Sequence, residues 1–271
     1  MVANTADDVE VYGVHVSPDP DLVTYWLADA IDERGYGLAG DSFEVLDALA
    51  AAGRETWFRL GDRDLAMCMI RTELLRSGRP LTEAHAAVVE AMGVSASVLP
   101  MCDSPVETWV KAAGEWAAFQ EFMIVHGAAG PVEGVELRGI DAARPSAAVL
   151  DALAGADVIV IGPSNPVISI GPILAVPGMR EAVAGSAAPV VAVSPFVGGR
   201  AVKGPTESFC AHAGIEQSAA GVAAAYAGLL DAIVADEDVP GLPSVTIDTL
   251  MDTPEDRRRV AAAAIELGRS L

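Results

Sequence analysis

Residues 156–172, with the sequence ADVIVIGPSNPVISIGP, decide how we interpret the fold of this chain. Residues 158–161 form an apolar, β-branched run without polar alternation, which is typical of a strand buried on both faces of a parallel sheet. The run ends at residues 162–166, a loop with two prolines, a hydroxyl and a carboxamide. Ligands of open α/β sheets bind beyond the carboxyl ends of the strands. This loop is therefore either a phosphate-binding loop or only a rigid connector.

The overall composition bounds the class of protein. With 271 residues and 52% hydrophobic content, the chain can bury a large core in one elaborate domain or in two small ones. No run of 18 apolar residues occurs, and Met1 is not followed by a basic and then an apolar segment, so we expect a soluble cytoplasmic protein. The three cysteines are isolated and lack metal-type spacing, which favours reduced thiols in the core.

The charge balance is strongly acidic. The sequence has 38 acidic against 17 basic residues, and its formal net charge is −21. An acidic surface repels nucleic acids and anionic membranes, so we expect neither as a partner. The balance fits adaptation to high salt, but it also fits a high-GC genome that replaces Lys with Arg. The total charge does not determine the charge of a substrate, because a local site can be cationic or hold a metal.

The first half of the sequence is predicted to contain a helical insertion over residues 21–93. Apolar residues recur there at helical spacing in four segments, each followed by a glycine. A strand and a β-hairpin around residues 113–114 should follow. The predicted elements are helices at residues 21–34, 42–52, 64–77 and 82–92, a strand at 95–99, hairpin arms at 106–111 and 116–125, and a strand at 135–138.

In the second half, helical and apolar segments alternate. This order predicts a three-layer α/β fold with a mostly parallel sheet, in a single domain over residues 1–271. The predicted helices lie at residues 146–153, 177–184, 205–213 and 218–230 and from about 253 onward, and the predicted strands lie at 158–161, 190–193 and 233–235.

Two acidic clusters near the amino end are candidates for a metal site. The first, NTADD, holds Asp7 and Asp8 just after a predicted strand end, and the second, SPDPD, holds Asp19 and Asp21 at the start of a helix. Carboxylates from both clusters can converge on a hard cation such as Mg²⁺. The alternative is that these acids only form turns and cap the helix.

Two loops that contain glycine also carry charged residues. In FRLGDRDL, Gly61, Asp62 and Arg63 precede an apolar helix, so Arg63 either contacts a substrate oxygen or belongs to a surface ion pair. In SPFVGGRAVKGP, Arg200 and Lys203 are scarce cations after a buried strand. They either contact a phosphate or lie in a solvated loop.

Other catalytic patterns find no support. The four histidines have no spacing suited to a metal site or a triad, and only His15 lies near a candidate site. The sequence has no G-x-S-x-G, no zinc-binding helix motif and no Walker motif, so hydrolase and P-loop functions lack support. A nicotinamide dehydrogenase lacks support as well, because no G-x-G-x-x-G with a following acid stands between a predicted strand and helix.

Taken in order along the chain, several motifs resemble the 2-phospho-L-lactate transferase family of coenzyme F420 biosynthesis. The most specific of them is IGPSNPVISIGPILAVPGMRE at residues 161–181. The resemblance covers essentially the whole chain. The other matching motifs are NTADD (4–8), VSPDPD (16–21), FRLGDRDLA (58–66), LPMCDSPVET (99–108), FQEF (119–122), VAVSPFVGGRAVKGP (191–205) and DTLM (248–251).

The resemblance implies a Rossmann-like α/β fold, a homodimer and a specific reaction. Enzymes of this family transfer a phospholactyl group from a guanosine-diphosphate-activated donor to the ribityl hydroxyl of the deazaflavin FO. GMP leaves, and Mg²⁺ is required. Bacterial relatives use a phosphoenolpyruvyl donor instead, and the sequence leaves the choice of donor open.

The resemblance also implies roles for individual residues. Asp8, with Asp19 or Asp21, would bind Mg²⁺, and Asp7 would accept the proton of the attacking hydroxyl. The residues expected to bind FO are Gly61, Asp62 and Arg63, and those expected to bind the guanosine nucleotide are Gly162, Ser164, Asn165, Pro166, Arg200 and Lys203.

The amino end departs from the family pattern. The family begins with a strand and a GGTG loop that belongs to the nucleotide and acceptor site, and this sequence does not contain them. We therefore keep two alternatives to the transferase. The first is an inactive, N-terminally truncated paralogue, and the second is a regulator of the same fold that binds a sugar nucleotide without catalysis.

Overall fold

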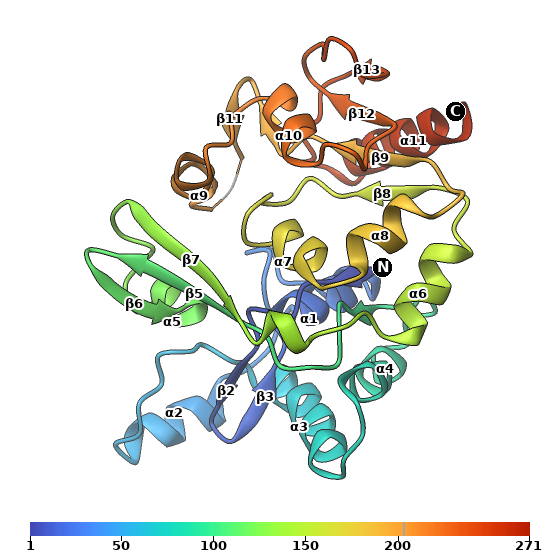
Figure 1. Ribbon diagram of the computed structural model, residues 1–271. Helices are drawn as coiled ribbons and strands as arrows, with labels where there is room; N and C mark the ends of the chain where they lie inside the picture. Colours follow the sequence, from blue (N-terminus) through green and yellow to red (C-terminus); the bar gives the residue numbers. More distant parts are fainter. Residues whose placement is uncertain (203) are drawn as a thin grey trace. The chain divides into compact units, whose positions relative to one another are not determined.

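The computed structural model describes residues 1–202 and 204–271. Contacts between Cα atoms divide the chain into two compact units (Figure 1). The prediction of a single domain with an insertion at residues 21–93 stays a prediction. The first unit comprises Met1–Gly130 and Val135–Val149, and the second comprises Pro131–Gly134 and Leu150–Leu271.

The first unit begins with a short parallel pair of strands. β1 (Val2–Ala3) pairs with β4 (Leu99–Pro100), so the strand predicted at residues 95–99 begins later and is shorter than expected. Ala3 packs in a small buried cluster with Val98. The pair directs the chain that leaves β1 into the loop that carries Asn4–Asp8.

A β-hairpin that the sequence analysis did not predict follows this loop. Its strands are β2 (Val9–Val11) and β3 (Val14–Val16), which pair antiparallel. The two turn residues, Tyr12 and Gly13, have φ values of 53° and 78°. A two-residue turn with positive φ at both positions matches the right-handed twist of the strands. The hairpin therefore returns the chain to the SPDPD segment.

The four helices predicted for residues 21–93 are confirmed, with shifted ends. The first begins at Pro18 rather than at residue 21, and its two prolines lie in the first turn, where their missing N–H groups cost nothing. It ends at Leu27 instead of residue 34, and Ile31 then forms a β-bridge with Leu38. The helices are α1 (Pro18–Leu27), α2 (Glu44–Ala51), α3 (Asp62–Arg76) and α4 (Leu81–Ala91).

The hairpin predicted around residues 113–114 is confirmed, but its second arm has four residues instead of the predicted ten. β5 (Glu107–Ala112) pairs antiparallel with β6 (Glu115–Ala118). The chain then forms α5 (Phe119–Ile124), where Phe119 and Phe122 lie one helical turn apart and are both buried. β7 (Val132–Arg138), which begins in the second unit, is the third strand of this sheet.

The second unit contains the parallel sheet predicted from residues 156–172. Its strand order is β13-β12-β9-β8, and all neighbours pair in parallel. β9 and β12 lie in the centre and are buried along their whole length. The strands are β8 (Ile159–Ile161), β9 (Val190–Val193), β12 (Ala232–Ala235) and β13 (Ser244–Thr246).

Helices cover both faces of this sheet, which makes the second unit a three-layer α/β structure (Figure 1). Val191 and Ala232 pack against α11, whereas Ala192 and Ile233 face the opposite side, because successive residues of a strand alternate between faces. The opposite face packs against residues of α7, α8 and α10. These helices are α7 (Ile170–Ala175), α8 (Met179–Ala184), α10 (Ala219–Ala225) and α11 (Pro254–Arg269).

The predicted start of the last helix is confirmed by its cap. Thr253 accepts from the backbone N–H of Asp256, and the Asp256 side chain accepts from the N–H of Thr253, so two unpaired donors of α11 are satisfied. Among the described residues, no helix is long and apolar enough to cross a membrane. The remaining elements are η1 (Ile140–Ala142), α6 (Ala147–Ala154), β10 (Phe196–Val197), β11 (Arg200–Ala201) and α9 (Thr206–Ala213).

Candidate functional site

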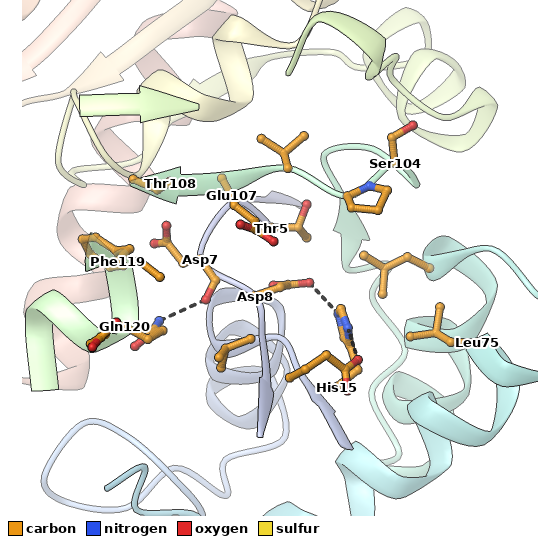
Figure 2. A pocket seen from close by; sticks show the side chains of 18 of the residues that line it. Thr5, Asp7, Asp8, His15, Leu75, Ser104, Glu107, Thr108, Phe119 and Gln120 are labelled. Atoms are coloured by element: carbon orange, nitrogen blue, oxygen red, sulfur yellow. Dashed lines mark hydrogen bonds and ion pairs between the residues drawn. The ribbon is translucent and has the colours of Figure 1, made fainter. Parts of the chain in front are cut away.

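The first unit contains a cavity of about 1240 Å³ beside the acidic loop that follows β1 (Figure 2). Segments from β3, from β5 and from the start of α5 complete its wall. Apolar side chains, including Trp57 and Phe119, share the wall with acidic ones. The acidic and histidine side chains in the wall are Asp7, Asp8, Glu10, His15, Glu55, Asp103, Glu107 and Glu121.

Asp7 is the most deeply buried acid of this wall, with 6% of its surface exposed. Its backbone carbonyl accepts a hydrogen bond from Gln120 Nε2 at 3.1 Å, but its carboxylate Oδ1 has no hydrogen-bond partner among the described residues (Figure 2). Burial and the nearby charge of Asp19 raise the pKa of Asp7 well above its ordinary value. Asp7 is therefore a buried carboxyl group that holds its proton more tightly than usual.

Asp8 is held by two side chains on the hairpin and the start of α1. Its Oδ1 accepts from Ser17 Oγ at 2.7 Å, and its Oδ2 lies 2.8 Å from His15 Nε2 (Figure 2). Burial raises the pKa of Asp8 despite these two hydrogen bonds. On the far side of the imidazole, His15 Nδ1 lies 3.2 Å from Glu10 Oε1. His15 therefore stands between two carboxylates and fixes the orientation of Asp8.

His15 is in turn fixed by α3. The backbone carbonyl of His15 accepts from Arg71 Nε at 3.2 Å and from Arg71 Nη2 at 3.1 Å, and its backbone N–H donates to Thr72 Oγ1 at 2.8 Å. Burial lowers the pKa of the His15 imidazole, but the hydrogen bond and charge of Asp8 raise it by more, so the net shift is upward. A positively charged His15 matches its position between two acids.

Asp19 joins Asp7 and Asp8 from the first turn of α1. Its Oδ2 accepts from Asn4 Nδ2 at 3.1 Å, while Asn4 Oδ1 accepts from the N–H of Ala6. Burial, together with the charge of Asp8, raises the pKa of Asp19 to about 6. The two predicted acidic clusters therefore do meet, through the hydrogen bonds of Asn4 with Asp19 and of Ser17 with Asp8.

Asp21 lies apart from this group. Its two oxygens accept from Arg71 Nη1 and Nη2 at 2.6 and 2.7 Å, and the Arg71 side chain is fully buried. A bidentate pair with a buried guanidinium uses both carboxylate oxygens. Ligand atoms of Asp21, Asp64 and Cys68 lie within 4.8 Å of one another, but Arg71 supplies the positive charge there. Asp21 is therefore part of a structural ion pair, and the choice of the second metal ligand stays a prediction.

Gly61, Asp62 and Arg63, which we expected to bind FO, do not line the cavity. The Asp62 carboxylate accepts from Ser42 Oγ at 2.7 Å and from the N–H groups of Glu44 and Val45 at 3.0 Å, so it caps α2. Asp62 therefore stabilises the start of α2, a role that its position in the FRLGDRDL motif does not predict.

Asp41 makes the reciprocal contact with α3. Its carboxylate accepts from the N–H groups of Arg63 and Asp64 at 2.9 and 3.0 Å. The position of Gly61 follows from this cap, because a Cβ at residue 61 would lie 2.2 Å from Asp41 Oδ2. Arg63 Nη1 donates to the carbonyl of Ala39 at the surface. The Gly61–Arg63 segment therefore joins two helix starts.

The loop at residues 162–166 follows β8 in the second unit. The Asn165 side chain is buried: its Oδ1 accepts from the N–H groups of Val167 and Ile168, and its Nδ2 donates to Thr206 Oγ1 at 3.3 Å. Asn165 therefore holds the loop in shape and ties it to α9, whereas the Ser164 side chain is exposed. Asn165 thus stabilises the conformation of this loop, whereas Ser164 is accessible to a ligand.

The remaining nucleotide-site predictions fall on the same unit. No neighbouring atom lies within 4 Å of the position that a Cβ would take at Gly162, and Pro166 is buried. Arg200 is exposed at the start of β11, and Lys203 lies outside the described residues. Because β8 and β9 run in parallel, the loops that follow them begin at the same edge of this sheet.

Sequence reasoning missed most of the cavity wall. Glu55, Trp57, Glu107 and Phe119 come from segments far apart in the chain, and no spacing rule connects them. The motifs LPMCDSPVET and FQEF had been recognised as part of the resemblance without a role for their residues. Both motifs contribute to the wall, so their match to the family is the sequence feature that could have identified these residues as part of the site.

Comparisons with known proteins agree on one family. The family model described as 2-phospho-L-lactate transferase CofD matches residues 1–261. A 2-phospho-L-lactate transferase of Methanosarcina mazei is 38% identical over 276 residues, which cover 98% of this chain and 90% of the relative. A phosphoenolpyruvate transferase of Streptomyces coelicolor is 42% identical over 243 residues, which cover 87% of this chain and 76% of the relative.

A solved structure shares the fold. A UPF0052 family protein from Bacillus halodurans superimposes with a TM-score of 0.58 and 16% identity, over 97% of this chain and 89% of that protein. This likeness supports the open α/β fold, and the closer sequence relatives supply the family. The chain belongs to the 2-phospho-L-lactate transferase CofD family, and thus to a family of transferases.

Proposed function

We propose that this chain transfers a 2-phospho-L-lactyl or phosphoenolpyruvyl group from a guanosine-diphosphate-activated donor to the deazaflavin FO, with GMP as the leaving group, in coenzyme F420 biosynthesis. The family match supports a transferase. Relatives named for either donor acid align at 38% and 42% identity, so both donors remain in the proposal.

The observation that carries the proposal is the pair Asp7 and Asp8 in the cavity wall, with Asp19 near enough for its charge to raise the pKa of Asp7. Neighbouring carboxyl groups of this kind would be stabilised by a hard divalent cation, which prefers oxygen ligands. We propose that Asp8 and Asp19 hold Mg²⁺. The bound ion would neutralise charge on the phosphate oxygens of the donor. We leave Asp21 out of the metal site because the fully buried Arg71 guanidinium already neutralises its charge, whereas the partners of Asp8 are a hydroxyl and a titratable imidazole.

We assign the proton transfer to Asp7. Asp7 belongs to the cavity wall, and its raised pKa makes it a stronger base than an exposed carboxylate. The hydroxyl that attacks phosphorus must lose a proton as the new P–O bond forms and the bond to GMP breaks. The Asp7 carboxylate would accept that proton. Gln120 holds the backbone of Asp7, and His15 with Ser17 holds Asp8 beside it.

The cavity also suits an acceptor that combines a flat ring with a polyol chain. Its apolar wall, which includes Trp57, Val106 and Phe119, can cover a ring, and its carboxylates can accept hydrogen bonds from hydroxyl groups. We therefore place FO in this cavity and move the acceptor role away from the Gly61–Arg63 segment.

The donor nucleotide is assigned to the loops of the second unit. We propose that the backbone of Gly162, the hydroxyl of Ser164 and the guanidinium of Arg200 contact its phosphates. Asn165 and Pro166 would keep the loop in shape. Lys203, which lies outside the described residues, keeps its predicted role as a phosphate contact. A homodimer stays a prediction.

The test compares Asp7→Asn and Asp8→Asn in full-length protein with FO, Mg²⁺ and each guanosine-activated donor, with the fluorescent product measured by chromatography. We expect Asp7→Asn to lower kcat by at least about 100-fold, the range for a lost general base. Asp8→Asn should also weaken Mn²⁺ binding measured by calorimetry. The matched control is Asp29→Asn, an exposed site outside the cavity wall.

Two results would contradict the proposal. Wild-type turnover by Asp7→Asn would remove Asp7 as the base, and unchanged Mn²⁺ affinity in Asp8→Asn would remove Asp8 from the metal site. If the wild-type protein forms no product with either donor but binds a sugar nucleotide, the transferase proposal fails and the regulator alternative replaces it.

A further inference from the structure

The turn of the β2–β3 hairpin contains a residue that its backbone conformation disfavours. Tyr12 has a φ of 53°, in the left-handed region that Asn and Gly occupy readily and that a bulky side chain adopts only at a cost in free energy. Gly13, the other turn residue, has a φ of 78° without that cost. A strained residue persists where its surroundings offset the strain. The contacts of the Tyr12 side chain must therefore compensate for its backbone.

The Tyr12 hydroxyl makes two hydrogen bonds with the backbone of one distant residue. It donates to the carbonyl of Phe58 at 2.7 Å and accepts from the N–H of Phe58 at 3.2 Å, across 46 positions of the sequence. One side chain thus pairs with both backbone groups of a residue that belongs to no helix or strand. Tyr12 therefore attaches the segment at residues 54–60 to the hairpin. We call these two hydrogen bonds the Tyr12 staple.

Trp57, the residue before Phe58, is the part of this segment that carries an aromatic ring to the cavity. It lines the cavity of about 1240 Å³ and also a second hollow of about 740 Å³, which Tyr12 lines as well. The Trp57 ring contacts the Phe58 ring edge to face, with 5.6 Å between the ring centroids. Because open space borders Trp57 in two hollows, close packing does not fully enclose the indole, and its position depends on the backbone that carries it.

We propose that Tyr12 is a positioning residue for the acceptor, because its staple fixes Trp57 where the indole covers the acceptor ring. The inference rests on the proposed function in one respect, which is that FO occupies this cavity. Tyr12 is not part of the wall of that cavity, so it acts through Trp57 and not by contact with the ligand. Without the staple, Trp57 gains freedom to move toward the second hollow, and ordering the indole again on binding lowers the affinity.

Other contacts attach the same segment near its two ends. The N–H of Arg54 donates to the carbonyl of Leu49 in α2, and the Arg59 guanidinium lies 4.1 Å from the centroid of the Phe43 ring. Removal of the Tyr12 hydroxyl therefore leaves the segment attached near both ends and loosens its middle, where Trp57 lies. Tyr12→Phe is a suitable test because it keeps the ring and the turn and removes only the staple.

The experiment is a double-mutant cycle in full-length protein, with the dissociation constant of FO measured through deazaflavin fluorescence. Trp57→Ala should weaken FO binding by about tenfold or more, the range for a lost stacking contact. Tyr12→Phe should weaken it by about fivefold, the usual effect of one side chain that must be ordered on binding. In the double variant FO should bind no more weakly than in Trp57→Ala, because the staple then has no indole to position.

Two controls distinguish this role from a general loss of structure. The affinity for GDP, which we assign to the loops of the second unit, should stay within about twofold of the wild-type value in Tyr12→Phe when measured by calorimetry. Tyr36→Phe removes a hydroxyl from an exposed tyrosine that lines neither hollow, so it should leave the affinity for FO unchanged.

The outcomes separate this inference from the proposed function. If Tyr12→Phe lowers only the free energy of unfolding, or weakens FO binding as much in the Trp57→Ala background as in the wild-type background, the positioning role is overturned and the transferase proposal stands. Absence of FO binding by the wild-type protein, or wild-type affinity in Trp57→Ala, overturns the placement of the acceptor ring and the inference with it. A loss in Tyr12→Phe that disappears in the Trp57→Ala background supports the inference.

Discussion

Arg71 shows how a single buried residue organises the first unit. Its guanidinium is fully buried and donates to both oxygens of Asp21, to the carbonyl of His15 and to Cys68 Sγ. A buried charge without these partners would cost several kcal/mol. Because one contact is with Asp21 and another with the strand that presents His15, Arg71 couples the structural ion pair to the orientation of Asp8.

Asp64, close to this ion pair, leads to a prediction about pH and stability. Burial and the charge of Asp21 raise its folded-state pKa from 3.8 to about 6. A raised pKa means that the folded protein binds this proton more tightly than the unfolded chain does, so the associated stabilisation is present at low pH and is lost as the pH rises through about 6. Asp64→Asn should remove that dependence while still accepting the hydrogen bond from Tyr25.

The measurement is the free energy of unfolding in urea at pH 4.5 and pH 7.5. The wild-type protein should lose about 2 kcal/mol more than Asp64→Asn between these two values. Other groups titrate in both proteins, so the difference between the variants isolates Asp64. Parallel pH profiles would show that the carboxyl group is ionised in the folded protein throughout this range.

Among the helices, α2 and α3 are joined at their starts by an exchange of caps. Asp62, the first residue of α3, accepts from N–H groups of α2, and Asp41, which precedes α2, accepts from N–H groups of α3. A carboxylate at a helix start satisfies unpaired donors and interacts favourably with the helix dipole. The conspicuous LGDRD motif therefore has a structural explanation in this fold.

From this exchange of caps we predict that Asp62→Ala destabilises the protein without changing its affinity for FO. The free energy of unfolding should fall in Asp62→Ala, as it does when a helix cap is removed, and Asp41→Ala should have the same effect. The dissociation constant for FO, measured by fluorescence, should stay at its wild-type value in both variants. Weaker FO binding at unchanged stability would instead return Asp62 to the acceptor site.

For the whole molecule, the formal net charge of −21 is the dominant electrostatic fact. Repulsion among so many carboxylates opposes the compact state, because unfolding lets the charges move apart. Dissolved salt screens that repulsion within a Debye length of about 10 Å at 0.1 M.

We therefore predict that the melting temperature rises with salt. Between 10 mM and 200 mM NaCl the increase should be at least about 2 °C, which corresponds to roughly 1 kcal/mol for a protein of this size. Tetramethylammonium chloride should produce the same shift if screening is the cause. A flat response would indicate that the carboxylates are too well separated to repel one another, and a shift with sodium alone would indicate specific ion binding.

Local pattern was sufficient for most of the secondary structure, because a helix or strand reflects the spacing of apolar residues within a short window. The four helices of the first unit, the β5–β6 hairpin and the strands β8, β9 and β12 were predicted in this way. The β2–β3 hairpin is not predicted because its strands are three residues long. The α5 segment is predicted as strand because residues 116–125 are rich in aromatic and β-branched residues, although the spacing of Phe119 and Phe122 is helical. The family was also recognisable from the sequence, since its motifs occur in order along the chain.

Only the tertiary structure decided which side chains pair with one another through hydrogen bonds and charges. Asp19 and Asp21 look equivalent in the motif, yet Asp21 faces Arg71, which is 50 residues away in sequence, and Asp19 faces Asn4 and Asp7. Likewise, Asp62 and Asp7 are both acids in matching motifs, but one meets the start of a helix and the other the wall of a cavity. Spacing along the chain determines which residues share a helix or a strand. The role of each acid depends on the charges and hydrogen bonds around it, and these come from residues that only folding brings together.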